Sequence, residues 1–187
     1  MKLKIAQISD IENILKLHYK YQVDSIKEED KKDGFVTTAF TASELENIIR
    51  DEKGIFIAIK DDEVVGYVMS ASWEYWSKWK MFEFMVKNLP SLEFNGQTIT
   101  KENSYQYGPV CIDKSVRGSG VLEELFDFSL ESMSKRFSIL VTFVNKINPR
   151  SYAAHKRKLG LEEIAQFEFN NNFYHEFAFD TSKRVLS

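Results

Sequence analysis

The feature of this 187-residue chain that most limits its possible folds is a strand–helix–strand succession in its second half. The apolar segment 110–112 is followed by a glycine-containing loop at 117–120 and by an amphipathic helix from about 120 to 136. The near-continuous apolar run 139–144 comes next. A helix that joins two strands in this way predicts parallel neighbours. The apolar character of 139–144 indicates a central strand that is covered on both faces.

The first half of the chain predicts one strand followed by two helices. Residues 3–8 are compatible with a strand, and a helix follows to about Tyr21. Ser-x-x-Glu spacing at 9–12 and Thr-x-x-Glu spacing at 41–44 match capping boxes, which mark the starts of helices. The second helix is expected to stop near Gly54, because glycine suits the end of a helix.

Two hairpins are predicted around the central unit. Segments 55–59 and 64–69 are rich in strand formers and are separated by a short turn, and 161–169 with 173–179 close the chain in the same way. A helix from about 149 to 159 lies between the central strand and the closing hairpin. We therefore expect an α/β fold with a mixed, mostly antiparallel sheet, one parallel β-α-β crossover and about four flanking helices.

An aromatic-rich insertion occupies about residues 73–106 of this order. Trp73, Trp76 and Trp79 recur every three residues, so a single helix would present them on one broad stripe. Three interpretations remain open: a small core that covers the sheet, an aromatic wall for a ligand, and a dimer interface. The segment is too short for a second domain, so residues 1–187 are expected to form a single domain.

Composition excludes several classes of protein. The formal net charge of −3 gives no basic footprint for nucleic acid. Only one cysteine, Cys111, is present, which rules out an internal disulfide and fits a reducing compartment. The histidines are too scattered to suggest a metal site. With no apolar stretch long enough for a signal peptide or a membrane span, we expect a cytoplasmic protein that has no membrane or nucleic-acid partner.

The loop ahead of the 120–136 helix has the properties of a phosphate-binding turn. The start of a helix carries unpaired N–H groups and a partial positive charge, and glycines let an anion approach them. Arg117 can add charge and Ser119 a hydroxyl group. The alternative is that Gly118 and Gly120 only shape a tight turn, and the spacing alone favours that alternative. The loop matches neither standard nucleotide fingerprint.

The same loop resembles the acyl-CoA signature of the GNAT superfamily of N-acetyltransferases, Gln/Arg-x-x-Gly-x-Gly/Ala at the start of a helix. The residues that fit its first five places are Arg117, Gly118, Ser119, Gly120 and Val121. Leu122 stands in the sixth place, where the family usually has Gly or Ala. The resemblance implies that acetyl-CoA is the co-substrate and that its pyrophosphate binds at this loop.

A second segment resembles the same family. Residues 148–155 followed by Leu-Gly-Leu at 159–161 are similar to the family's Asn-x-x-Ala/Ser-x-x-x-Tyr/His…Leu-Gly-Phe pattern, with one extra residue before Gly160. The resemblance implies that Asn148 and Ser151 contact the CoA arm. It also implies that the residue at the position of His155 protonates the departing thiolate.

An acetyltransferase of this kind must meet three requirements at the thioester. Two substrates must be held together, a donor must bind the oxyanion, and an acid must protonate the thiolate. The resemblance places the oxyanion donor at a backbone N–H near Cys111 or Ile112. His155 and Tyr152 are three residues apart on one helix, so either can supply the acid. A packed helix face is the alternative for both side chains.

A nucleophilic Cys111 that forms an acetyl-enzyme is an alternative to direct transfer, but the place of Cys111 within an apolar strand favours a buried structural thiol. We therefore expect an enzyme that transfers an acetyl group from acetyl-CoA to a primary amine of a small molecule, peptide or protein. A homodimer is compatible with the aromatic insertion. The alternative functions are an acyl-CoA-binding sensor without turnover and an interaction protein whose glycine loop is only a turn.

Overall fold

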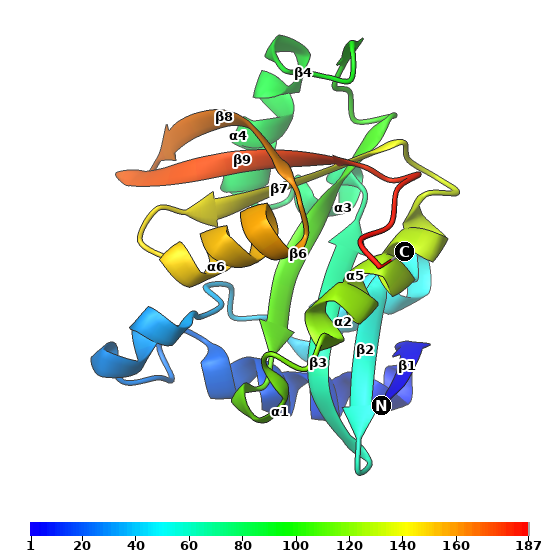
Figure 1. Cartoon of the computed structure of the whole chain (residues 1–187), viewed down its shortest axis with the longest axis vertical. Helices are drawn as coiled ribbons and strands as arrows, with labels where there is room; N and C mark the ends of the chain where they lie inside the picture. Colours follow the sequence, from blue (N-terminus) through cyan, green and yellow to red (C-terminus); the bar gives the residue numbers. More distant parts are fainter. Residues whose placement is uncertain (187) are drawn as a thin grey trace. The chain divides into compact units, whose positions relative to one another are not determined.

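The protein is described here by a computed structural model that covers residues 1–186, with seven strands in one sheet and a separate two-stranded hairpin (Figure 1). The strands of the large sheet are β1 (Lys2–Ile5), β2 (Ile55–Lys60), β3 (Glu63–Ala71), β6 (Ser104–Ile112), β7 (Ile139–Asn145), β8 (Glu162–Phe169) and β9 (Asn172–Asp180). Their order is β1-β2-β3-β6-β7-β9-β8. Strands β6 and β7 pair in parallel, whereas β1–β2, β2–β3, β7–β9 and β8–β9 are antiparallel. The predicted mixed, mostly antiparallel sheet with one parallel crossover is confirmed.

The helices follow the predicted order along the chain. The α-helices are α1 (Ile11–Tyr21), α2 (Ala42–Asn47), α3 (Trp73–Trp76), α4 (Lys80–Asn88), α5 (Val121–Met133) and α6 (Pro149–Ala153). Short 3₁₀ turns are η1 (Ile8–Asp10), η2 (Glu28–Asp33), η4 (Leu89–Ser91) and η5 (Lys114–Val116), and π-helical turns are η3 (Ile48–Glu52) and η6 (Ala154–Lys158). Within residues 1–186, every helix is too short or too polar to cross a membrane.

The described residues form two compact units that are each built from separate parts of the chain. The first unit contains Met1–Ser70, Gly108–Ser129 and Leu186, and the second contains Ala71–Tyr107 and Leu130–Val185. The glycine loop therefore belongs to the first unit. The aromatic insertion and the helix that begins at Pro149 belong to the second.

In the first unit, one of the two predicted helix starts is confirmed. Thr41 accepts a hydrogen bond from the Glu44 amide at 3.2 Å, and the Thr41 amide donates to the Glu44 carboxylate at 2.9 Å, which is a complete capping box. The box expected at Ser9 and Glu12 is wrong. The chain turns earlier, through η1, and the amide of Gln7 donates to Asp10 at 2.7 Å. A helix start can thus move upstream when a 3₁₀ turn precedes it.

The second predicted helix stops near Gly54, as expected, and the structure gives this glycine a further role. The π-helical turn η3 ends at Glu52, and Lys53 takes the left-handed conformation at its end with φ of 50°. A Cβ atom on Gly54 would lie 1.7 Å from the carbonyl oxygen of Ser70. The same two residues share a hydrogen bond of 2.7 Å from the Ser70 amide to the Gly54 carbonyl. Glycine is therefore required by a close approach of two backbones.

In the second unit, the aromatic insertion is a pair of short helices followed by the β4–β5 hairpin, with β4 at Glu93–Phe94 and β5 at Gln97–Thr98. The expected single tryptophan stripe is wrong, because α3 ends at Trp76 and Trp79 lies between the two helices, immediately before α4. Trp73 and Trp76 are 0% and 1% exposed, so their rings belong to the core. The insertion also ends earlier than expected, because β6 begins at Ser104.

Candidate active site

The glycine loop runs from the end of β6 to the start of α5 in the first unit. Gly118 and Gly120 have φ of 81° and 91°, a backbone conformation that side-chain-bearing residues rarely adopt. A Cβ atom at either position would meet no described atom within 4 Å. The loop therefore presents bare backbone immediately before the 13-residue helix α5, whose first N–H groups have no partner within the helix.

Two features of the α5 start bear on anion binding in opposite directions. The helix dipole and the free N–H groups favour an anion there. Glu123 and Glu124 lie in the first turn and bring negative charge to it. Glu124 is exposed and Glu123 is half-buried, so water screens both carboxylates.

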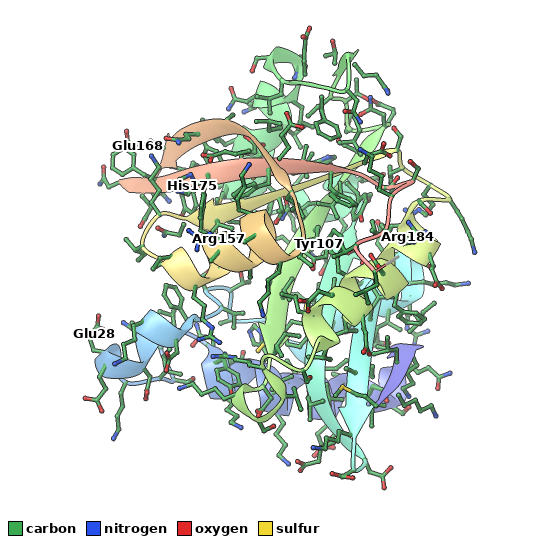
Figure 2. All side chains as sticks on the ribbon, in the orientation of Figure 1. Glu28, Tyr107, Arg157, Glu168, His175 and Arg184 are labelled. Atoms are coloured by element: carbon green, nitrogen blue, oxygen red, sulfur yellow. The ribbon has the colours of Figure 1, made fainter. Side chains whose placement is uncertain are left out.

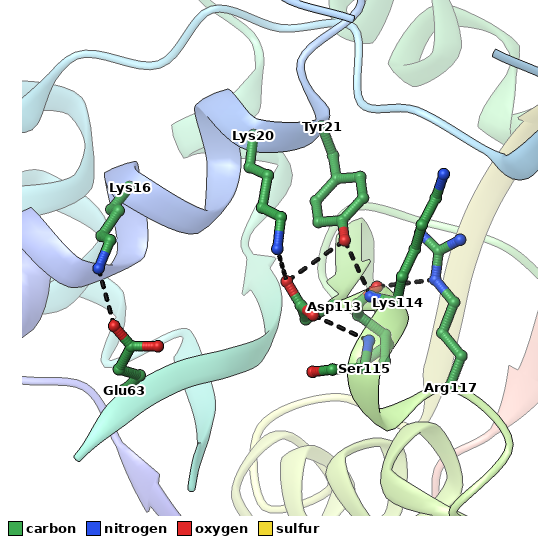
Figure 3. Close-up of polar contacts among 9 residues, drawn as sticks. Lys16, Lys20, Tyr21, Glu63, Asp113, Lys114, Ser115 and Arg117 are labelled. Atoms are coloured by element: carbon green, nitrogen blue, oxygen red, sulfur yellow. Dashed lines mark hydrogen bonds and ion pairs between the residues drawn. The ribbon is translucent and has the colours of Figure 1, made fainter. Parts of the chain in front are cut away.

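Asp113 fixes the start of the loop through a polar cluster that the sequence did not reveal (Figure 3). Its carboxylate accepts hydrogen bonds from Lys20 Nζ at 2.6 Å, Tyr21 Oη at 3.3 Å and the Ser115 amide at 2.9 Å. Burial opposes ionisation of this carboxyl, but the bonds from Lys20 and Ser115 outweigh it and hold the pKa of Asp113 well below its usual range. The cluster connects the end of β6 to α1 through hydrogen bonds, and no local sequence motif predicts it.

Arg117 lies at the loop, as the sequence predicts, and its guanidinium already makes structural contacts. Its Nε donates to the carbonyl of Ile112 at 2.9 Å and its Nη1 donates to the carbonyl of Asp33 at 2.9 Å. The guanidinium also lies 5.1 Å from the centre of the Tyr21 ring. Ser119 is exposed, and its hydroxyl donates to the carbonyl of Val116 in the same loop at 2.7 Å.

Cys111 lies in β6 and is 4% exposed. Burial raises the pKa of this thiol to about 12, so the thiol stays protonated near neutral pH. A protonated, buried thiol is a poor nucleophile, which agrees with the structural interpretation made from the sequence. The neighbouring Ile112 is half-buried and supplies the carbonyl that Arg117 contacts.

In the second unit, Asn148 begins the helix that carries the other candidate residues. Its side-chain oxygen accepts a hydrogen bond from the Ser151 amide at 3.1 Å, and Pro149 occupies the first helical position. This is an N-cap, so Asn148 has a structural role whether or not it also contacts CoA. The helix continues from α6 into the π-helical turn η6.

His155 is buried at 8% exposure within η6. Its Nδ1 lies 2.7 Å from the carbonyl oxygen of Ser151, and a carbonyl only accepts, so Nδ1 carries the proton. Burial lowers the pKa of His155, which keeps the ring neutral near pH 7. In a neutral ring with the proton on Nδ1, Nε2 carries the lone pair.

Tyr152 and His155 both have their rings close to that of Phe177. The Phe177 ring centre lies 5.6 Å from that of Tyr152 and 6.2 Å from that of His155. The Tyr152 hydroxyl donates to Glu163 at 3.2 Å, and Glu163 is also bonded to His175 Nδ1 at 2.6 Å. Desolvation and the Glu163 contact raise the pKa of Tyr152, so the phenol keeps its proton.

The predicted site residues thus fall into two groups. Cys111 to Val121 lie in the first unit and Asn148 to His155 in the second. Across residues 1–186, no cluster of three or more His, Cys, Asp or Glu side chains is placed to hold a metal ion.

Solved structures with a similar fold include chains whose names identify them as N-acetyltransferases. The protein smu.2055 from Streptococcus mutans UA159 is 16% identical, with a TM-score of 0.63 over 97% of this chain and 99% of that one. Ribosomal-protein-alanine N-acetyltransferase from Brucella melitensis is 18% identical, with a TM-score of 0.61 over 96% and 99%. The protein yncA from Salmonella typhimurium, solved with its cofactor acetyl-CoA, is 12% identical, with a TM-score of 0.64 over 98% and 95%.

No curated protein matches the chain by sequence. The sequence model of the acetyltransferase (GNAT) family matches residues 16–161, which is most of the chain and includes both the glycine loop and the His155 segment. The chain therefore belongs to the GNAT acetyltransferase family.

Proposed function

We propose that this protein transfers the acetyl group of acetyl-CoA directly to a primary amine of a small molecule, peptide or protein. The observation that carries the proposal is the loop from Arg117 to Val121, in which two left-handed glycines leave the backbone bare ahead of a long helix. We assign the pyrophosphate to the backbone N–H groups of Gly118 to Val121, with Arg117 supplying positive charge. Asn148 and Ser151 are assigned to the CoA arm.

The oxyanion of the tetrahedral intermediate is assigned to a backbone N–H near Cys111 or Ile112. His155 is assigned to proton transfer. Because its ring is neutral, Nε2 first takes a proton from the attacking amine nitrogen and then returns it to the departing sulfur. One proton thus moves from nitrogen to sulfur while the C–N bond forms and the C–S bond breaks. Tyr152, which keeps its phenolic proton, is the second candidate acid.

A sensor that binds acyl-CoA without turnover is the second candidate function. Leu122 stands in the sixth place of the signature, and two carboxylates lie in the first turn of α5. Both features weaken phosphate binding at this turn. Release of free CoA separates the two functions, because a sensor binds acetyl-CoA and releases none in the presence of amines.

The first test is a calorimetric titration with acetyl-CoA, followed by a free-thiol assay across a panel of amines. We expect about one site per chain, and Gly120→Glu should abolish binding because it places a carboxylate where phosphate belongs. Gly96→Glu is the matched control, since Gly96 also has a positive φ of 72° and open space but lies in the β4–β5 turn. Equal binding by both folded variants would mean that the glycine loop is only a turn.

The second test addresses the proton-transfer residues. We expect His155→Ala to lower turnover by about 10²-fold or more with little change in acetyl-CoA affinity. Tyr152→Phe keeps the ring that packs on Phe177 and removes only the hydroxyl. If Tyr152→Phe is the slower variant, the acid is Tyr152.

The acceptor panel should contain peptides with free N-termini as well as small amines. The Brucella melitensis relative is a ribosomal-protein-alanine N-acetyltransferase, which is the reason to include alanine-first peptides. We also propose that all 187 residues act as one acetyltransferase-like domain and that the reaction takes place in the cytoplasm.

A further inference from the structure

A cavity of about 270 Å³ lies in the second unit between the aromatic insertion and the closing hairpin. Its walls come from α4 and the segment that follows it on one side and from β8 and β9 on the other. The less exposed side chains that line it are Phe84, Met85, Leu92, Ala165, Phe167 and Glu176, and its three exposed members are Asn88, Ser91 and Gln166.

Glu176 is the unusual member of this cavity. It is 4% exposed, and within residues 1–186 its Oε1 has no hydrogen-bond partner. A buried carboxyl oxygen without a donor costs free energy, so native proteins rarely keep one unless a ligand or water satisfies it. Burial raises the pKa of Glu176 to about 7, so the carboxyl is ionised above that pH.

The hairpin leaves room beside this carboxyl. Glu176 pairs across the β8–β9 ladder with Ala165, and the register shifts between Glu163 and Ala165. The small Ala165 side chain covers little of the space on that face of the sheet. Two of the remaining walls are aromatic: the ring centres of Phe84 and Phe167 lie 5.9 Å apart.

The cavity lies on the opposite face of the hairpin from His155. Phe177, the next residue along β9, contacts the rings of Tyr152 and His155, and successive side chains on a strand point to opposite faces. Glu176 is therefore not part of the proton-transfer group described above.

Two charged pairs on the surrounding elements lie away from Glu176. On α4, Lys87 bonds to Glu83 at 3.2 Å on the exposed face of the helix. On the hairpin, Glu163 bonds to His175 at 2.6 Å on the face that carries Phe177. Among the described residues that line the cavity, Glu176 is the one with a titratable side chain.

We propose that this cavity binds a small organic ammonium ion that carries one ring or branched apolar group, with the Glu176 carboxylate as its anionic partner. The cavity volume suits a ligand with one ring. It exceeds the roughly 150 Å³ that hold one benzene and lies just below the range of about 300–1,000 Å³ that is usual for pockets of larger ligands. The aromatic walls also favour a cation. The terminal torsion of a Glu side chain is soft, so Oε1 can turn toward the ligand.

The test uses the whole protein at pH 8 without acetyl-CoA, so its outcome does not depend on acetyl transfer. Benzylamine is the cationic probe and benzyl alcohol is the neutral probe of nearly the same shape. We expect saturable benzylamine binding by calorimetry, with NMR shifts centred on Phe84, Phe167 and Glu176. Benzyl alcohol should bind at least about 10-fold more weakly, because it cannot form the ion pair.

Three variants sharpen the test. Glu176→Gln keeps the shape and removes the charge, so benzylamine affinity should fall by about 10-fold or more. Glu168→Gln removes an exposed carboxylate from the same hairpin, labelled in Figure 2, and should leave affinity unchanged. Ala165→Leu fills the cavity and leaves Glu176 in place, and should also abolish binding.

Two results would overturn the proposal. Equal binding of the two probes, or undiminished benzylamine binding by Glu176→Gln, would show that the carboxylate does not recognise the cation. Absence of binding by the folded wild-type protein up to about 10 mM probe would show that the cavity holds only water.

Discussion

His155 donates its Nδ1 proton to the Ser151 carbonyl, and burial lowers its pKa below the ordinary value of 6.5. The ring should therefore remain neutral at pH 6.5 and take up a proton only at lower pH. We expect ¹⁵N NMR of the imidazole to show a protonated Nδ1 and an unprotonated Nε2 from pH 6.5 upward. A titration midpoint at or above pH 6.5 would contradict this state and with it the first proton-transfer step assigned to Nε2.

Cys111 allows a second prediction at the scale of single residues. With a pKa of about 12 and 4% exposure, its thiol is almost entirely protonated at pH 8 and shielded from reagents. We expect alkylation by iodoacetamide at pH 8 to be at least about 100-fold slower in the folded protein than in urea. Treatment of the folded protein should leave any acetyl transfer intact. Rapid labelling in the absence of denaturant would return Cys111 to the list of candidate nucleophiles.

At the scale of elements, the start of α6 combines a structural role with a proposed binding role. The Asn148 side chain caps the helix, and the family pattern assigns the same residue to the CoA arm. Asn148→Ser keeps an oxygen that can cap and removes the amide group, whereas Asn148→Ala removes both. We expect the Ala variant to lose about 1 kcal/mol of unfolding free energy and the Ser variant to lose much less.

Acetyl-CoA affinity then separates the two roles of Asn148. If its amide contacts the cofactor, both variants bind acetyl-CoA more weakly, although only the Ala variant is destabilised. Urea unfolding and calorimetry on the same preparations measure both quantities. Full affinity in the Ser variant would assign Asn148 to capping alone.

The helix that begins at Pro149 contains a π-helical turn that the sequence pattern did not predict. The extra residue between His155 and Gly160 is visible in the sequence, and the structure accommodates it in the π-helical turn Ala154–Lys158. A π-turn adds one residue to a helix without breaking it, and such turns are frequent at functional sites. Periodicity alone predicts a regular helix here, because a single insertion barely changes the pattern of apolar positions.

The same contrast holds for other elements. Order and type of the strands follow from long apolar runs, whose burial dominates the energy, so the sheet and its parallel pair were predictable. The arrangement of Trp73, Trp76 and Trp79 was not predictable from their spacing, because the segment forms two short helices and two of the three rings are buried. The Asp113 cluster joins residues more than 90 positions apart, as in its contact with Lys20. No local pattern reports such a contact.

At the scale of the whole molecule, buried ionisable groups make stability depend on pH in two opposite ways. Burial lowers the pKa values of His18 and His155, so their contribution to stability is present above pH 6.5 and is lost as pH falls toward their folded pKa values. The pKa of Glu176 is raised from 4.5 to about 7. Its contribution is present below pH 4.5 and is lost as pH rises through 7.

At pH 8 both histidines are neutral in the folded and unfolded chain, so Glu176 alone of these three opposes folding. Gln mimics the protonated carboxyl, and Glu176→Gln should therefore raise the free energy of unfolding by about 3 kcal/mol at pH 8. At pH 5 the gain should be below about 1 kcal/mol, because the carboxyl is protonated in the folded protein and pH 5 lies only half a unit above its unfolded pKa of 4.5. Urea unfolding of the wild type, Glu176→Gln and the exposed control Glu168→Gln at the two pH values measures this difference. A gain that is the same at pH 5 and pH 8 would mean that Glu176 does not carry a buried charge in the folded protein, and that the cavity beside it holds no anionic partner for a cation.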